Sequence, residues 1–237
     1  MSEPIHQQKM VNGPRSLIRI YDTLTGDEDA RVCTDIPEDA CREQPGNFFK
    51  HLSSSFFTKL GDSLASAKLI LPWLMATLGA PAYLVGFLVP IRESGALLPQ
   101  LLVAGFIRPK PVRKWFWVAA SVVEGLAVIG MAFVAIGAEG AMAGWAIVAL
   151  LAVFSLSRGV ASVTSKDVLG KTISKRRRGT LMGYASAVAG VVTILVGAYL
   201  KGFRGEDQPE SFFFLVLLGA GLLWFLAAAI FAFVKET

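Results

Sequence analysis

Two adjacent charged residues interrupt a long apolar stretch near the middle of that stretch. Residues 83 to 106 read YLVGFLVPIRESGALLPQLLVAGF, which places Arg92 beside Glu93. Neighbouring helical residues point about 100° apart, so the two charges cannot neutralise each other on one face. A charge inside a bilayer is costly and usually faces a protein interior or a water-filled cavity. We therefore expect Arg92 and Glu93 to line a solute or proton pathway.

Other polar residues in apolar stretches extend this candidate pathway. Gln100 lies eight residues after Arg92, on nearly the same helix face. The further candidates are Asp62, Lys68, Glu124 and Arg158. Counted along their helices, Asp62, Glu124 and Arg158 share one depth, so Arg158 could pair with either acid. The alternative interpretation is that such pairs are static and only lock the helices together.

These side chains need membrane helices to position them. The 237 residues are 54% hydrophobic, with a mean hydropathy of +0.55. A spanning helix needs about 20 mostly apolar residues. Six blocks reach that length: 54 to 79, 82 to 107, 115 to 138, 141 to 164, 179 to 201 and 211 to 234. The sequence thus predicts an all-α fold with a six-transmembrane-helix bundle over residues 53–237.

Prolines and glycines refine this picture of the helices. Pro72 lies in the first block, and Pro90 and Pro99 lie in the second. Proline kinks a helix, and such irregularity is tolerated in membranes where it lines a cavity. In the fifth block, glycines recur every seven residues and predict a smooth strip for close helix packing: Gly183, Gly190 and Gly197.

The first 52 residues form a short segment of different character. They carry nine acidic and six basic residues and no long apolar run. We expect this segment to be soluble, cytoplasmic and partly ordered. Its two cysteines, Cys33 and Cys41, would then be reduced thiols. Their spacing is not that of a zinc site, so we predict no metal.

The distribution of basic residues predicts the orientation. RPKPVRK at 108–114 carries four bases, and SKDVLGKTISKRRR at 165–178 carries six bases and one acid. Short basic loops stay on the cytoplasmic side, so both termini are predicted to be cytoplasmic, in a plasma or bacterial inner membrane. Because the bases flank apolar blocks, the net charge of +5 indicates contact with lipid and not with nucleic acid.

Enzymatic chemistry finds little support. His6 and His51, the only histidines, lie outside the six blocks, so no intramembrane Ser-His pair or His cluster is available. The LGKTIS stretch at 169–174 carries G-K-T, but Ser165 stands where a phosphate-binding loop needs its first glycine. We expect no enzyme activity and no cofactor.

The arrangement of blocks and loops resembles the amino-terminal half of a major facilitator superfamily transporter. That family's loop after the second helix follows G-x-x-x-D-[RK]-x-G-[RK]-[RK], against GFIRPKPVRK here. The matching residues are Gly105, Lys110, Arg113 and Lys114. Pro109 replaces the family's Asp and Val112 its second Gly. Arg158, in FSLSRGV, resembles the family's fourth-helix arginine, which is implicated in proton coupling.

This resemblance implies both an activity and a partner. It implies half of a twelve-helix secondary transporter that moves a small solute by alternating access, coupled to an ion or to protons. Gly105, Lys110, Arg113 and Lys114 would form its cytoplasmic gating loop. A second six-helix half, or a second copy of the chain, would complete the pathway. The alternative is a membrane-embedded scaffold or regulatory subunit that holds the same charges as static pairs.

Overall fold

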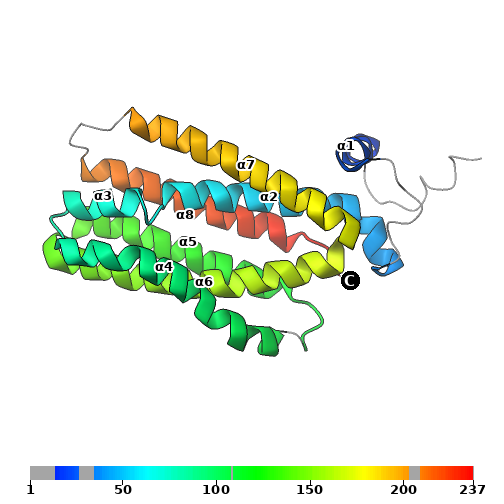
Figure 1. Ribbon diagram of the computed structural model, residues 1–237, viewed down its shortest axis with the longest axis horizontal. Helices are drawn as coiled ribbons and strands as arrows, with labels where there is room; N and C mark the ends of the chain where they lie inside the picture. The colour runs from blue at the N-terminus through cyan, green and yellow to red at the C-terminus, as the bar shows by residue number, and fades with distance from the viewer. Residues whose placement is uncertain (1–13, 27–34, 108, 203–208, 237) are drawn as a thin grey trace, which may run out of the picture.

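The structure, a computed structural model, describes residues 14–26, 35–107, 109–202 and 209–236 (Figure 1). Within these ranges the chain forms eight α-helices and no strand, which confirms the all-α prediction. The helices are α1 (Arg15–Thr25), α2 (Glu38–Leu64), α3 (Ile70–Thr77), α4 (Ala82–Ile107), α5 (Lys114–Gly137), α6 (Gly140–Thr172), α7 (Lys175–Lys201) and α8 (Glu210–Ala232).

The last five predicted blocks each correspond to one helix, from α4 to α8. The helix α6 continues to Thr172, beyond the predicted end near residue 164. Four of the described helices, α5 to α8, are long and apolar enough to cross a membrane. Four such helices are typical of an integral membrane protein. The count of six spans stays a prediction, because α4 and the first block are not among the four.

The first predicted block is not one continuous helix, and here the prediction was wrong. Helix α2 begins at Glu38 and ends at Leu64, residues 65–69 are not helical, and α3 follows. Pro72 supplies the physical reason, because within a continuous helix its ring would clash with the carbonyl of Lys68. As the third residue of α3, Pro72 occupies a position whose missing N–H costs no intrahelical bond. Helix α2 also runs unbroken through residues 52 and 53, the predicted domain boundary.

The long helices lie side by side in an elongated bundle (Figure 1). The main packed pairs are α5 with α8, α4 with α6, α5 with α6, α2 with α8, and α2 with α7. Glycines let α5 and α8 approach closely: a Cβ on Gly221 would lie 2.5 Å from Cγ1 of Ile129. A Cβ on Gly125 would lie 3.0 Å from the carbonyl oxygen of Gly221. Such small-residue contacts are a common way to pack membrane helices.

Helix α7 is the least covered of the long helices. Many of its apolar side chains are exposed, including Ile194 at 71%. A Cβ added to any glycine of the predicted strip would meet no atom within 4 Å: Gly183, Gly190 and Gly197. The predicted close packing at this strip is therefore not made within the described chain.

The N-terminal segment departs from the prediction in one chemical respect. Cys41 is disulfide-bonded, so the expectation of two free thiols was wrong for this residue. Cys33, the only other cysteine of the sequence, lies outside the described residues. The spacing of two cysteines cannot by itself show whether the fold brings a thiol to a partner.

Candidate functional site

Four helices bring charged side chains together beside the gap between α2 and α3. Asp62 lies in the last turn of α2, Arg92 in α4, Arg158 in α6 and Glu124 in α5. A carboxylate near a helix C-terminus is electrostatically unfavourable, so Asp62 needs nearby positive charge. Gly95 on α4 allows Arg92 to approach Asp62, because a Cβ at this position would lie 2.7 Å from Cβ of Ser155 on α6. The missing side chain allows α4, and with it Arg92, to lie close to α6.

Asp62 accepts hydrogen bonds from both arginines. Nη2 of Arg92 donates to Oδ1 of Asp62 at 2.7 Å, and Nη2 of Arg158 donates to Oδ2. These side chains are only 16–25% exposed, so solvent screens the pairs weakly. The ring of Phe154 lies 4.8 Å from the guanidinium carbon of Arg92 and adds a cation–π contact. One carboxylate thus joins three helices.

Arg158 also reaches a deeper acid. Its Nη1 lies 3.5 Å from Oε2 of Glu124, whose side chain is 0% exposed. Within the described residues, the other oxygen of Glu124 has no hydrogen-bond partner, and neither does the buried Nε1 of Trp224. Two arginines and two carboxylates therefore form one cluster of balanced formal charge. A buried carboxylate oxygen without a hydrogen bond is energetically costly. Glu124 is therefore the member of the cluster whose hydrogen bonding is least complete.

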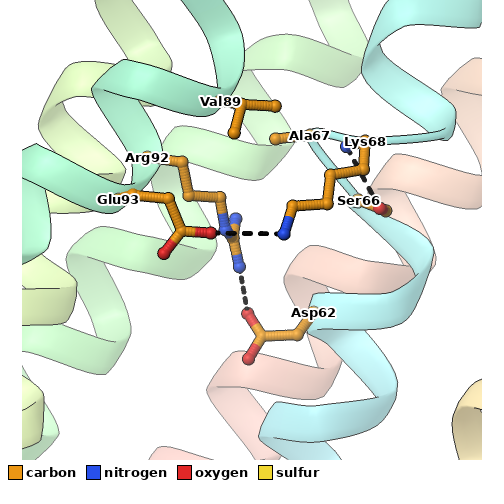
Figure 2. A pocket seen from close by; sticks show the side chains of 7 residues that line it. All are labelled: Asp62, Ser66, Ala67, Lys68, Val89, Arg92 and Glu93. Carbon is orange, nitrogen blue, oxygen red and sulfur yellow. Dashed lines mark hydrogen bonds and ion pairs between the residues drawn. The ribbon is translucent and has the colours of Figure 1, made fainter.

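A small cavity opens onto this cluster (Figure 2). Its volume is about 190 Å³, and it is lined by Asp62, Ser66, Ala67, Lys68, Val89, Arg92 and Glu93. In Figure 2, Lys68 extends from the gap between α2 and α3 toward Glu93 on α4. Nζ of Lys68 lies 3.5 Å from Oε1 of Glu93, with both side chains more than 60% exposed. So exposed a pair adds little stability and can open at small cost.

The backbone between α2 and α3 forms one wall of the cavity. The carbonyl oxygen of Ser66 accepts from the N–H groups of Leu69 and Leu71, at 3.3 and 3.0 Å. The Ser66 hydroxyl accepts from the Lys68 N–H at 3.3 Å. Local bonds therefore replace the regular helix ladder in this stretch. At membrane depth such backbone is tolerated only where protein or a water-filled cavity surrounds it.

The structure brings most of the predicted pathway residues together. Asp62, Lys68, Arg92 and Glu93 line the cavity, while Glu124 and Arg158 join it through ion pairs. Both pairs that the sequence allowed for Arg158 occur. The side chain of Gln100 lies outside the described part of the structure.

Sequence reasoning missed the pairing of Arg92 with Asp62, and two features stood in its way. The break after α2 was not foreseen, so the end of that helix was not expected beside α4. Composition also carries no information on which two helices are neighbours. The only signal available was the shared presence of opposite charges deep in the first two blocks.

The predicted loop residues join three helix ends, away from the cavity. Nη1 of Arg113 pairs with Oδ2 of Asp167 on α6 at 3.1 Å. Nζ of Lys114 donates to the carbonyl oxygens of Ala232 and Val234, both at 2.8 Å, at the end of α8. Lys110 and Gly105 are exposed.

Glu236 completes this connection, and the sequence gave no sign of its role. Its Oε2 accepts from the backbone N–H groups of Arg113 and Lys114, at 2.7 and 2.8 Å. A carboxylate at this place satisfies donors that the first turn of α5 leaves open. In turn, Nζ of Lys114 donates to carbonyl oxygens that lack a partner within the end of α8. The start of α5 and the end of α8 therefore cap each other.

Comparison with known proteins identifies no relative. No family, no characterised protein and no solved structure matches the chain. The class that the fold defines is therefore a helical protein with at least four described helices suited to cross a membrane.

Proposed function

We propose that this protein is one half of a secondary active transporter for a small solute, of the major facilitator type. The observation that carries the proposal is the charged cavity beside a broken helix. Substrate sites of such transporters lie near the bilayer midplane, where discontinuous helices expose backbone groups. The gap at residues 65–69 follows Asp62 and contains Lys68, and Arg92 also lines the cavity. Partly screened charges of both signs can bind a solute or exchange a proton.

The packing of the helices supports a transporter architecture. Helix α4 packs on α6 as α7 packs on α2, and α5 packs on α6 as α8 packs on α2. If α2 is exchanged with α6, α4 with α7 and α5 with α8, each of these packed pairs becomes another of them. The remaining main pair, α5 with α8, is unchanged by this exchange. The helices of the first three proposed spans can therefore be exchanged with those of the last three without changing which helices are the main neighbours. Internal repeats of three helices within each six-helix half are a feature of this class of transporter.

We propose six spans, with residues 54–79 of α2 and α3 as the first and α4 as the second. The C-terminus lies at the end of the bundle where α2 begins, as an even number of spans requires (Figure 1). Bases of both basic loops, including Arg113 and Lys171, lie at the end of the bundle that also holds Glu236. The positive-inside rule favours a cytoplasmic location for this end, whereas the disulfide of Cys41 at the same end favours an oxidising compartment. The membrane would be a plasma or bacterial inner membrane.

The second half is a necessary part of this proposal. In this one unit the cavity is open enough to leave Lys68 and Glu93 largely exposed. Charges so placed inside a bilayer need water or protein around them. A second six-helix unit, from another chain or a second copy of this one, would enclose the cavity. Protonation of Glu124 would weaken its hold on Arg158 and so couple a proton to the cluster.

A static scaffold or regulatory subunit is the second candidate, and one observation favours it. Together with Glu124, Asp62 already balances the charges of Arg92 and Arg158, and the two arginines donate hydrogen bonds to both oxygens of the aspartate. Such a cluster can fix the relative position of three helices without any transport.

Water access to the cavity distinguishes the two functions without knowledge of the solute. Ser66→Cys would be introduced with Cys33→Ser and Cys41→Ser, and the protein would be reconstituted in vesicles. Membrane-impermeant thiol reagents would then be applied to each side in turn. A transporter should allow labelling of position 66 from both sides, because the cavity alternates between them. Labelling from one side only, or from neither, would exclude a transporter formed by two copies of this chain and would favour the scaffold.

A matched control shows that the labelling reports the cavity. Ser155 is fully buried on α6, so Ser155→Cys in the same background should remain unlabelled from either side. In a transporter, Arg92→Ala should also change the rates from the two sides unequally, since it removes a tie between α2 and α4. In a scaffold, Arg92→Ala should leave the labelling rates of position 66 unchanged, or position 66 should not be labelled at all.

A further inference from the structure

Helix α1 has two chemically different faces. Its sequence is RSLIRIYDTLT, and at 3.6 residues per turn Leu17, Ile20 and Leu24 fall on one side. Arg15 and Arg19 fall on the opposite side, and both are exposed. A short helix of this pattern buries its apolar side against either protein or lipid.

The protein itself covers only part of the apolar face. Tyr21 is 4% exposed and packs edge-on against Phe48 of α2, with ring centres 5.4 Å apart. Its hydroxyl accepts from Nε2 of Gln44 at 2.6 Å, and the guanidinium of Arg177 lies 4.8 Å from its ring. Ile20, one residue earlier, is 53% exposed. The helix is thus anchored through Tyr21, and the Ile20 side of its apolar face remains open.

The direction and level of α1 fit the surface of a membrane. Figure 1 shows α1 nearly end-on, so its axis crosses the long axis of the bundle. If the bundle spans a bilayer, α1 therefore lies along the membrane plane. Its last turn meets α7, where the hydroxyl of Tyr184 donates to the carbonyl oxygen of Leu24 at 3.2 Å. Tyr184 lies where the basic first turn of α7 gives way to the apolar part of the helix. Tyrosines are enriched at this level, where a helix crosses the surface of a bilayer.

We propose that α1 is an interfacial helix that docks on the phospholipid surface beside α7. The Ile20 side enters the boundary between headgroups and acyl chains, and Arg15 and Arg19 bind lipid phosphate groups. The exposed Lys175 and Arg176 of α7 add positive charge at the same level. A lipid surface is the occupant that the observations favour, because α1 lies across the bundle axis at the level of Tyr184, next to the basic first turn of α7. The inference depends on the spans and not on transport.

Spin labels on the full-length protein in phospholipid nanodiscs test this placement. One label would be attached at Ile20→Cys and a matched one at Arg19→Cys, each with Cys33→Ser and Cys41→Ser. The two positions lie about 100° apart on the helix. Collisions with oxygen report lipid, and collisions with a water-soluble nickel complex report water.

The docked helix predicts a clear difference between the two sites. The ratio of oxygen to nickel collisions should be several-fold higher at position 20 than at position 19, with a depth of about 5–10 Å below the phosphates. Nanodiscs with anionic lipid should increase the difference relative to phosphatidylcholine alone. Equal and high nickel access at both positions would overturn the proposal. So would equal exclusion of nickel at both, since that indicates burial of α1 against protein.

Discussion

At the scale of single residues, we expect the substitution of Asp62 to destabilise the fold strongly. Its carboxylate faces two arginines and is 16% exposed. We expect Asp62→Asn to lower the free energy of unfolding by about 3–5 kcal/mol, because Arg92 would lose its carboxylate partner and Arg158 would keep only its longer contact with Glu124. Equilibrium unfolding in mixed micelles measures this change.

Glu93→Gln provides the control, since it also removes one carboxylate from an ion pair in the cavity. Glu93 is 66% exposed, so the expected loss is only between 0 and about 1 kcal/mol. Equal losses of unfolding free energy for the two variants would mean that the ion pairs of Asp62 are no more shielded from water than the exposed pair of Lys68 and Glu93.

His51 provides a prediction on pH, from a site outside the cavity. Its Nε2 lies 3.0 Å from the hydroxyl oxygen of Thr172, and that hydroxyl donates to the carbonyl of Val168. The imidazole must therefore donate, which a neutral ring can do. Burial, with the nearby charge of Lys50 as a second cause, lowers the pKa of His51 to about 4.

The sign of the pH effect follows from this lowered pKa. The unfolded chain, with a histidine pKa of about 6.5, binds the proton more readily. Stability should therefore fall as pH drops from about 6.5 to about 4, by an amount on the order of 3 kcal/mol. The His51→Gln variant keeps a donor to Thr172 but does not titrate, so its stability should depend less on pH in this window. His6→Gln is the control; a slope for His51→Gln as steep as that of the unchanged protein would contradict the assignment.

At the scale of elements, the sequence predicted most helices but not the break that shapes the site. Helices α4 to α8 could be predicted because each contains about 20 mostly apolar residues. The gap at residues 65–69 could not be placed, because alanine, serine and lysine are acceptable in a helix and hydropathy does not separate a broken span from a continuous one. Pro72 predicted irregularity, yet a proline fixes neither the extent nor the direction of a break. The shared depth of Arg158 and its acids was readable from spacing, whereas the pairing of Arg92 needed the tertiary arrangement.

The role of Pro72 is open to a direct test. We expect Pro72→Ala to let helical bonds extend across residues 65–69, because the backbone regains a donor and loses a clash. The labelling rate of Ser66→Cys by water-soluble thiol reagents should then fall several-fold, while thermal stability stays equal or rises. Pro81→Ala is the matched control, since Pro81 precedes α4 and interrupts no helix. An unchanged labelling rate in Pro72→Ala would show that Asp62 and its arginines, and not the proline, keep the helix broken.

At the scale of the whole molecule, the exchange symmetry of the packing makes α4 and α7 equivalent. Both also expose apolar side chains, among them Tyr83 at 60% and Ile194 at 71%. The largely exposed Lys68 and Glu93 lie on the α4 side of the bundle. A second six-helix unit that covered α4 and α7 together would remove these charges from contact with lipid. The open glycine strip of α7 would then meet a helix of the partner, as small residues in membrane helices commonly do.

Disulfide cross-linking tests whether a second copy occupies this face. Gly190→Cys, in the open strip of α7, and Leu222→Cys, on α8 where the native side chain is 54% exposed, would each be introduced with Cys33→Ser and Cys41→Ser. Mild oxidation in vesicles at a low protein-to-lipid ratio should give a covalent dimer for position 190, because the paired strips hold these thiols together in a lasting complex. Position 222 should give only the small yield that random collisions produce. Dimers at equal yield from both positions would mean that the copies meet only by chance. A chain that stays monomeric in vesicles while position 66 is still labelled from both sides would mean that no second copy is needed to enclose the cavity.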